Sequence, residues 1–176
     1  SELYRCCAFT GHRPSKLPWK YDENDKRCIE LKAVLAQQID KLAAAGITDF
    51  YTGMALGVDT WAAMATLDLR ERNPAIKLHC VLPCEVPAQV RYNYILSEAD
   101  SVEYVKQSYD KKCMLERNRR LVDSAAFLLA IYNGEQRGGT AATVRYAQKV
   151  GREITYINPE TLIVFKWGPA PDTTYP

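Results

Sequence analysis

The sequence predicts an α/β fold in which a mainly parallel sheet carries helices on both faces. Short apolar runs that suit buried strands alternate with longer segments whose apolar residues recur at helical spacing. This alternation is typical of a parallel sheet covered on both sides. A length of 176 residues fits a single domain of this kind. Three of the expected strands also end in glycine loops, at the edge where such sheets bind ligands.

The chain begins with the apolar strand Arg5–Thr10, which runs into the loop Gly11–Pro14. Because proline disfavours helical geometry in the residue before it, we expect this loop to be ordered and extended. Asp25 can then cap a helix that extends to about Ala45, and Gly46 ends it. The core face predicted for this helix consists of Ile29, Ala33, Ala36, Ile39, Leu42 and Ala43.

The middle of the chain repeats this pattern. Thr48–Thr52 is a second strand, and the glycine loop Gly53–Asp59 after it opens directly on a helix that ends near Arg72. Ala75–Leu82 is a third strand. The next expected elements are a less regular helix from about Ala88 to Ala99, a brief strand at Ser101–Val105 and a helix at Lys112–Ser124.

The stretch from Ala125 to Ala147 predicts a place to hold phosphate. Ala125–Tyr132 is an apolar run typical of a strand buried on both faces, and the loop after it contains Gly138-Gly139 before a helix. A helix start offers unpaired N–H groups and a positive dipole end, and glycine lets a ligand approach the backbone. The alternative is that Thr140 is only an N-cap and the glycines only a turn.

The end of the chain is less regular. Glu153–Ile157 predicts a final strand. Residues 165–176 contain three prolines and no periodicity, so we expect a C-terminal tail after a domain of residues 1–164.

The composition is that of an ordinary globular protein, with 47% apolar residues, 25% charged residues and a net charge of +2. This near-neutral charge argues against a strongly basic nucleic-acid surface, although it leaves a local patch open. No apolar run approaches the length of a membrane-spanning helix, and no signal peptide is evident, so we expect a cytoplasmic protein without a membrane partner. The six cysteines include no CxxC pair and only two histidines occur, so we expect no metal site, disulfide or cofactor.

The three glycine loops should converge, because the carboxyl ends of parallel strands meet at one edge of the sheet. We therefore expect one ligand site to be built from several distant segments. The residues expected there are Gly11, His12, Arg13, Gly53, Gly57, Asp59, Arg117, Asn118, Gly138, Gly139 and Thr140.

Five side chains are candidates for contact with a ligand or for catalysis. Arg117 flanks the apolar stripe of its helix, and either extends to water or reaches over the strand ends as a planar fork for phosphate or sugar. Asp59 either supports the start of its helix or accepts hydrogen bonds from ribose hydroxyls. His12 either closes its turn or contacts the ligand, and Arg13 is either a surface residue or a ligand contact. Glu85, near the end of the third strand, is a candidate for acid–base work without an assigned partner.

Three motifs occur in an order that resembles the SLOG superfamily, a Rossmann-like group. They are TGHRP at Thr10–Pro14, GxxxGxDxWAA at Gly53–Ala63, and a late block formed by Arg117-Asn118 and Gly138–Ala141. The resemblance covers roughly residues 5–160 and is greatest to the largely uncharacterised YpsA-like branch. It implies a single Rossmann-like domain, and it implies a homo-oligomer, specifically a dimer, because superfamily members often pair through helices beside the site.

The superfamily includes the Lonely guy phosphoribohydrolases, and this implies a possible hydrolytic activity. Met114–Asn118 is similar to their MxxRK block, which implies a catalytic role for Arg117. Their PGGxGTxxE motif is matched at Gly138–Thr140, but Thr143 stands in place of the catalytic glutamate. A neutral hydroxyl cannot do the work of that carboxylate, so hydrolysis would need another one. The candidates are Asp59 and Glu85.

The superfamily also includes DNA-processing protein A, which has a turn similar to Gly53–Asp59 and binds single-stranded DNA. Such binding needs a basic groove with aromatic platforms. The residues available for a local basic patch are Lys106, Lys111, Lys112 and Arg120.

The sequence therefore predicts a protein that binds a nucleotide or nucleotide-derived small molecule, as a sensor or sequestering protein. Gly138, Gly139 and Thr140 would hold the phosphate. Arg117 would neutralise it, and Asp59 would bind sugar hydroxyls. The alternatives, in order, are an N-glycosidic or phosphoribosyl hydrolase acting on nucleotides and a protein that binds single-stranded DNA.

Overall fold

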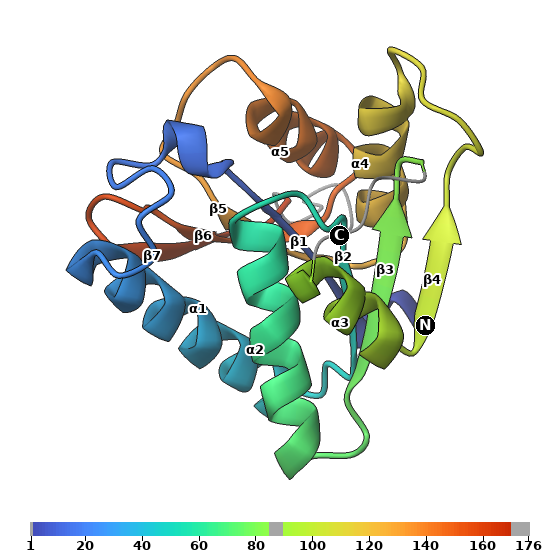
Figure 1. The fold of residues 1–176 in the computed structure, drawn as a ribbon, viewed down its shortest axis with the longest axis horizontal. Coiled ribbons are helices and arrows are strands. Elements are labelled where there is room, and N and C mark those ends of the chain that lie inside the picture. Colours follow the sequence, from blue (N-terminus) through green and yellow to red (C-terminus); the bar gives the residue numbers. More distant parts are fainter. Residues whose placement is uncertain (1, 85–89, 170–176) are drawn as a thin grey trace, which may run out of the picture.

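A computed structural model of the chain describes residues 2–84 and 90–169. The strands in this part of the chain are β1 (Cys6–Gly11), β2 (Asp49–Thr52), β3 (Lys77–Leu82), β4 (Ser101–Tyr104), β5 (Phe127–Ile131), β6 (Glu153–Ile157) and β7 (Val164–Trp167). They form one sheet in the order β4-β3-β2-β1-β5-β6-β7. All neighbouring pairs are parallel except β6 and β7, which are antiparallel (Figure 1).

Helices cover both faces of the sheet, as the sequence predicts (Figure 1). They are α1 (Lys26–Ala44), α2 (Val58–Arg72), α3 (Val90–Glu98), α4 (Cys113–Asp123) and α5 (Gly139–Lys149), with short 3-10 turns η1 (Glu2–Arg5) and η2 (Pro14–Lys16). On one face α2 contacts both α1 and α3, and on the other α4 contacts α5. Among the described residues, no helix combines the length and apolar character needed to cross a membrane.

Strands β1 and β5 are almost entirely apolar because each of their faces is buried. Phe9 of β1 belongs to the cluster formed with α1 and α2, whereas Ala8 beside it belongs to the cluster formed with α4 and α5. In β5, Leu129 and Leu128 divide between the same two clusters. Alternate residues of a strand point to opposite faces, so a strand between two helical layers has no polar side.

The strand order reverses at β1, and this fixes where loops gather. From β1 the chain builds the sheet outward to β4, then crosses to the opposite side of β1 with β5. The connections that leave the carboxyl ends of β1 and β5 therefore diverge to opposite faces. In sheets of this kind the crevice at such a reversal is where ligands bind.

Helix α1 confirms its predicted start but only part of its predicted core face. Ile39 is buried, and Leu42 and Ala43 pack against the core. The Asp25 carboxylate accepts a hydrogen bond of 2.9 Å from the backbone N–H of Arg27. The buried residues are Cys28, Leu31, Leu35, Gln38 and Ile39, whereas Ile29 is 55% exposed. This helix carries apolar residues at more than one helical spacing. Packing against the sheet, which the sequence pattern does not contain, selects the stripe centred on Leu31 and Leu35.

The first residues of the predicted tail, 165–167, belong to strand β7. This strand pairs with β6, and the ring of Phe165 stacks on that of Tyr156 with centroids 4.7 Å apart. A strand of four residues gives too short an alternation to recognise in the sequence. Residues 170–176 of the predicted tail lie outside the described residues.

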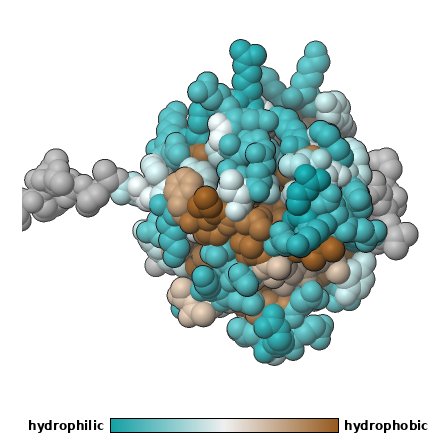
Figure 2. All heavy atoms as spheres, turned by 90° about the vertical axis from the view of Figure 1, so that its left-hand side faces the viewer, coloured by the Kyte–Doolittle hydropathy of each residue, from teal (hydrophilic) through white to brown (hydrophobic). Residues whose placement is uncertain are grey.

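Strand β7 forms one edge of the sheet, on the side of the molecule shown in Figure 2. Apolar side chains gather there between hydrophilic ones (Figure 2). Ile163, just before β7, and Phe165 are both exposed. Single apolar residues at a surface are ordinary, so we assign no function to this side.

The close contact between β1 and α2 yields a test of the packing. A Cβ atom on Gly11 would lie 2.5 Å from Cγ1 of Val58, which is itself buried. We expect Gly11→Ala to lower the free energy of unfolding by about 1–3 kcal/mol, because extra atoms in a packed core force their neighbours apart. Denaturant unfolding followed by circular dichroism measures this.

The second substitution Val58→Ala provides the control, since it removes the two γ-methyl groups at 2.5 and 2.8 Å and leaves only the Cβ of residue 58 at 2.7 Å from the added methyl group. The double variant should lose less stability than the sum of the two single variants. Simple additivity would show that Gly11 and Val58 do not constrain each other.

Candidate functional site

A cavity of about 270 Å³ lies at the carboxyl edge of the sheet. Its walls come from the end of β1 with the turn η2 that follows it, the loop after β2, the first turns of α2 and α5, and helix α4. Eight of the predicted site residues line it, namely Gly11, His12, Arg13, Asp59, Arg117, Asn118, Gly139 and Thr140. These residues come from four distant parts of the sequence.

The other three predicted glycines support the walls of the cavity without lining it. A Cβ on Gly53 would lie 2.7 Å from Nη1 of Arg117, and one on Gly57 would lie 2.8 Å from Cδ of Pro14. Gly138 adopts a φ of +102°, which favours glycine. These glycines let neighbouring segments approach closely. Glu85, the remaining candidate, lies outside the described residues.

Arg117 is the central cation of the site and is only 4% exposed. Its Nε donates a 2.8 Å hydrogen bond to Oδ1 of Asn118, and its Nη1 donates to the carbonyl of Gly53. Among the described residues, no carboxylate oxygen lies within 4.0 Å of the guanidinium. The interpretation that Arg117 extends to water is therefore wrong, because the side chain lies inside the protein. Burial lowers the pKa of Arg117, and the charge of Asp59 opposes this shift.

Asp59 is the second buried charge at the site, and its carboxylate does not cap the helix in which it lies. It accepts a 3.1 Å hydrogen bond from the backbone N–H of Ala55, in the loop before α2. Gly57 is the N-cap and makes no side-chain capping bond. Burial raises the pKa of Asp59, and the charge of Arg117 only partly offsets this effect.

His12 ties two strand ends together. Its Nε2 accepts a 3.1 Å hydrogen bond from the backbone N–H of Asn133, the second residue after β5. An accepting Nε2 places the proton of the neutral ring on Nδ1. Burial lowers the pKa of His12, which favours this neutral form. His12 thus completes the turns at the site, as one of its two interpretations expects, and it also lines the cavity.

The first turn of α5 faces the cavity without a side-chain cap. The N-cap is Gly138, and Thr140, the second residue of the helix, makes no capping bond. The interpretation of Thr140 as an N-cap is therefore wrong. The first backbone N–H groups of a helix have no partner within it, so they are available to a ligand.

Two further cations line the cavity that sequence reasoning did not select. They are Lys16 and Arg137. Lys16 forms an ion pair of 3.0 Å with Glu135, whose side chain does not line the cavity. Both cations lie within three residues of the selected motifs, which is the signal that could have identified them. With Arg13 and Arg117 they make four cations, whereas Asp59 is the one carboxylate in the described lining.

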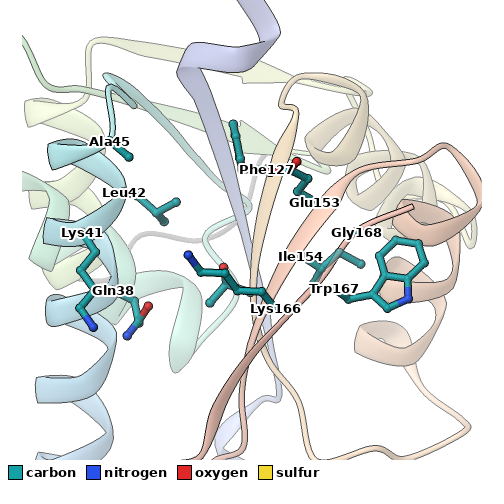
Figure 3. Close-up of a pocket in the computed structure, with 11 residues that line it drawn as sticks. Gln38, Lys41, Leu42, Ala45, Phe127, Glu153, Ile154, Lys166, Trp167 and Gly168 are labelled. Atoms are coloured by element: carbon teal, nitrogen blue, oxygen red, sulfur yellow. The ribbon is translucent and has the colours of Figure 1, made fainter. Parts of the chain in front are cut away.

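Another hollow, of about 330 Å³, lies at the opposite edge of the sheet (Figure 3). Side chains of α1, including Lys41, face those of β7, including Lys166, across it (Figure 3). It adjoins the amino ends of β5 and β6 and contains none of the predicted site residues. Because ligands of parallel sheets bind at the carboxyl ends, we assign the functional site to the first cavity.

This fold and site define a class: Rossmann-like α/β domains with a cation-rich cavity at the reversal of strand order. Residues 7–162 match the YpsA model of the YspA SLOG family. The chain belongs to this family.

Curated relatives agree with this assignment. The chain is 27% identical over 159 residues to a UPF0398 protein of Bacillus thuringiensis strain Al Hakam, covering 85% of each chain. It is 24% identical over 151 residues to the UPF0398 protein YpsA of Bacillus subtilis strain 168, covering 81% of this chain and 83% of that protein.

Two solved structures share the fold. DNA processing protein A from Streptococcus pneumoniae is 17% identical, with a TM-score of 0.63 over 88% of this chain. The same protein from Helicobacter pylori, studied for its single-stranded DNA binding mode, is 17% identical with a TM-score of 0.62 over 87% of this chain. The present chain spans 50% and 65% of those two chains.

The buried carboxylate of Asp59 leads to a pH-dependent prediction. Its folded pKa lies above its unfolded value of about 3.9. Between the unfolded and the folded pKa of Asp59, the unfolded chain releases this proton more readily than the folded protein. The free energy of unfolding therefore falls as the pH rises through this range. We expect Asp59→Asn to unfold at a higher temperature than wild type at pH 7, with a gain that shrinks as the pH approaches 4.

Thermal unfolding at several pH values measures this difference. The asparagine oxygen can still accept the hydrogen bond from Ala55. A lower melting temperature for Asp59→Asn at pH 7 would show that attraction to Arg117 outweighs the cost of burying the carboxylate.

Proposed function

We propose that this protein binds a nucleotide or nucleotide-derived small molecule in the cavity at the carboxyl edge of the sheet. The observation that carries this proposal is the buried guanidinium of Arg117, which has no carboxylate within 4.0 Å among the described residues. A buried charge is costly unless a partner compensates it. An anionic ligand in the cavity would be that partner.

The N-terminus of α5 supports phosphate as the anion. Backbone N–H groups of Gly139 and Thr140 would donate hydrogen bonds to phosphate oxygens, with the positive end of the helix dipole behind them. Arg117 would contribute a planar pair of donors, which matches phosphate geometry. Asn118, which already accepts a hydrogen bond from Nε of Arg117, would hold the guanidinium in place.

The remaining polar groups suit a nucleotide. The carboxylate of Asp59 would accept hydrogen bonds from sugar hydroxyls, and His12 and Arg13 would close the opposite side. A cavity of about 270 Å³ is near the lower end of the sizes common for small-molecule sites, about 300–1,000 Å³. This size supports a ligand with one nucleotide unit in the cavity.

Capture is favoured over hydrolysis by the surroundings of Thr143. This residue occupies the position of the catalytic glutamate in the phosphoribohydrolases, and its hydroxyl donates a 2.9 Å hydrogen bond to the carbonyl of Gly139. It does not line the cavity. A hydroxyl committed to its own helix is not a general base. We therefore propose a sensor or sequestering protein, with a nucleotide hydrolase that uses Arg117 and Asp59 as the alternative.

Binding of single-stranded DNA is the third candidate, because one structural neighbour was studied for that activity. The basic patch predicted for it is partly neutralised. Lys106 pairs with Asp110 and Glu116, and Arg120 pairs with Glu103 at 3.0 Å. This weakens the patch as a groove for nucleic acid. The dimer and the cytoplasmic location also belong to this proposal, the first from the family resemblance and the second from composition.

A thermal-shift panel of nucleoside mono-, di- and cyclic phosphates, ADP-ribose-like compounds and the matching nucleosides tests the proposal. A ligand at 100 times its dissociation constant should stabilise the fold by about 2.7 kcal/mol. We expect Arg117→Ala to lose this stabilisation for phosphate-bearing ligands and to keep the weaker response to nucleosides. Arg120→Ala, an exposed arginine on the same helix, should behave as wild type.

Equal loss for nucleotides and nucleosides in Arg117→Ala would assign a structural role to this residue. Mass spectrometry of the recovered ligand separates the two activities. Intact nucleotide supports capture, and free base with ribose phosphate supports hydrolysis. A response to oligonucleotides alone would favour the DNA candidate.

A further inference from the structure

A hollow of about 330 Å³, distinct from the one in Figure 3, adjoins the proposed nucleotide cavity along α4 and α5. It is called the second hollow below. Asn118 lines both hollows. Along α5, the cavity ends at Thr140 and the second hollow begins at Ala142. The two hollows therefore follow one another along the same helices, although the function proposed above uses only the first.

Asn118 stands at the junction between the two hollows. Its Oδ1 accepts the hydrogen bond from Arg117 in the first cavity. Its Nδ2 lies 3.9 Å from the point that a Cβ on Gly139 would occupy, at the start of α5. The amide is thus fixed between the buried arginine and the uncapped helix start. A ligand that passes from one hollow to the other would pass this amide.

The second hollow is lined by cations and by no carboxylate. Its cations are Arg119, Arg145 and Lys149. Within the described residues, none of the three has a carboxylate oxygen within 4.0 Å, whereas Arg70, Lys106 and Arg120 all do. Arg145 donates a 2.7 Å hydrogen bond to the carbonyl of Gln136. Because this acceptor is neutral, it does not compensate the charge of Arg145. Positive charge therefore continues from the cavity along the α4–α5 surface.

An aromatic ring accompanies these cations. The guanidinium of Arg119 lies over the ring of Tyr146, 5.3 Å from its centroid. The hydroxyl of Tyr146 donates a 2.7 Å hydrogen bond to Asp123, which fixes the ring. Asp123 is exposed and does not line the hollow. Proteins bind single-stranded nucleic acids with groups of these kinds. Bases stack on aromatic rings and guanidinium planes, and nearby cations contact the phosphates.

We infer that the two hollows together bind a phosphodiester-linked ligand of at least two nucleotides. The terminal phosphate would lie against Arg117 and the start of α5. The next nucleotide would extend past Asn118, with its phosphodiester near Lys149 and Arg145 and its base against the Arg119–Tyr146 pair. This inference rests on the proposed function and extends it from a single nucleotide to a short single strand of DNA or RNA. It does not use the partly neutralised patch of Lys106 and Arg120, because neither residue lines the two hollows.

Binding measurements with matched ligands test the inference. The ligands are thymidine 5′-monophosphate, the 5′-phosphorylated dinucleotide, a deoxythymidine decamer, and the uridine equivalents, which separate DNA from RNA. We expect wild type to bind the dinucleotide and decamer more tightly than the mononucleotide. The double variant Arg119→Ala/Lys149→Ala should lose about tenfold in affinity for the longer ligands. The slope of its log binding constant against log salt concentration should become shallower by about 0.7 for each lost phosphate contact.

The same double variant should bind the mononucleotide within about twofold of wild type, since neither residue lines the first cavity. Both residues are exposed, so the substitutions should not prevent folding. Lys41→Ala/Lys166→Ala removes two cations from the hollow at the opposite edge and is the matched control, with no loss expected. Circular dichroism and thermal unfolding confirm that each variant is folded.

The outcomes separate this inference from the function on which it rests. If wild type binds the mononucleotide but gains no affinity from the second nucleotide, or if the double variant keeps the gain, the extension is wrong and the nucleotide site stands. If wild type binds none of the ligands, both are wrong. Equal losses for mononucleotide and dinucleotide in the double variant would also overturn the extension.

Discussion

The site depends on one buried cation held by neutral partners. Arg117 lies inside the protein, where the carbonyl of Gly53 and the amide of Asn118 fix its guanidinium without cancelling its charge. A carboxylate in contact would have stabilised the empty protein and weakened the site for anions. Asp59 shares the cavity but bonds to the backbone of Ala55. The cavity thus keeps a net positive charge, which Asp59 offsets only in part, beside the uncapped start of α5.

Close contacts between loops keep that cation in position. Gly53 leaves room for the guanidinium, Gly57 lets Pro14 pack against the start of α2, and His12 joins the turn after β1 to Asn133 after β5. Each contact links segments that are distant in sequence, so the rim acts as one unit. Ligand groups then meet donors that are already oriented, which lowers the entropic cost of binding.

The sequence was sufficient for features that depend on local pattern. The apolar run Phe127–Ile131 is typical of a buried strand, and Asp25 is a typical N-cap at a helix start. Both patterns can be recognised within a few residues of sequence. The convergence of glycine loops followed from the geometry of parallel sheets. Features set by tertiary packing were not predictable. The buried face of α1, strand β7 and the inward direction of Arg117 are selected by neighbours that are distant along the chain.

The most direct test of the central claim is a ¹⁵N nuclear magnetic resonance titration with a nucleoside 5′-monophosphate. If the cavity holds phosphate as described, the backbone amides of Gly139 and Thr140 and the Nε–H of Arg117 will shift in parallel with one dissociation constant. Shifts confined to the hollow between α1 and β7, or no shift at millimolar nucleotide, would contradict it.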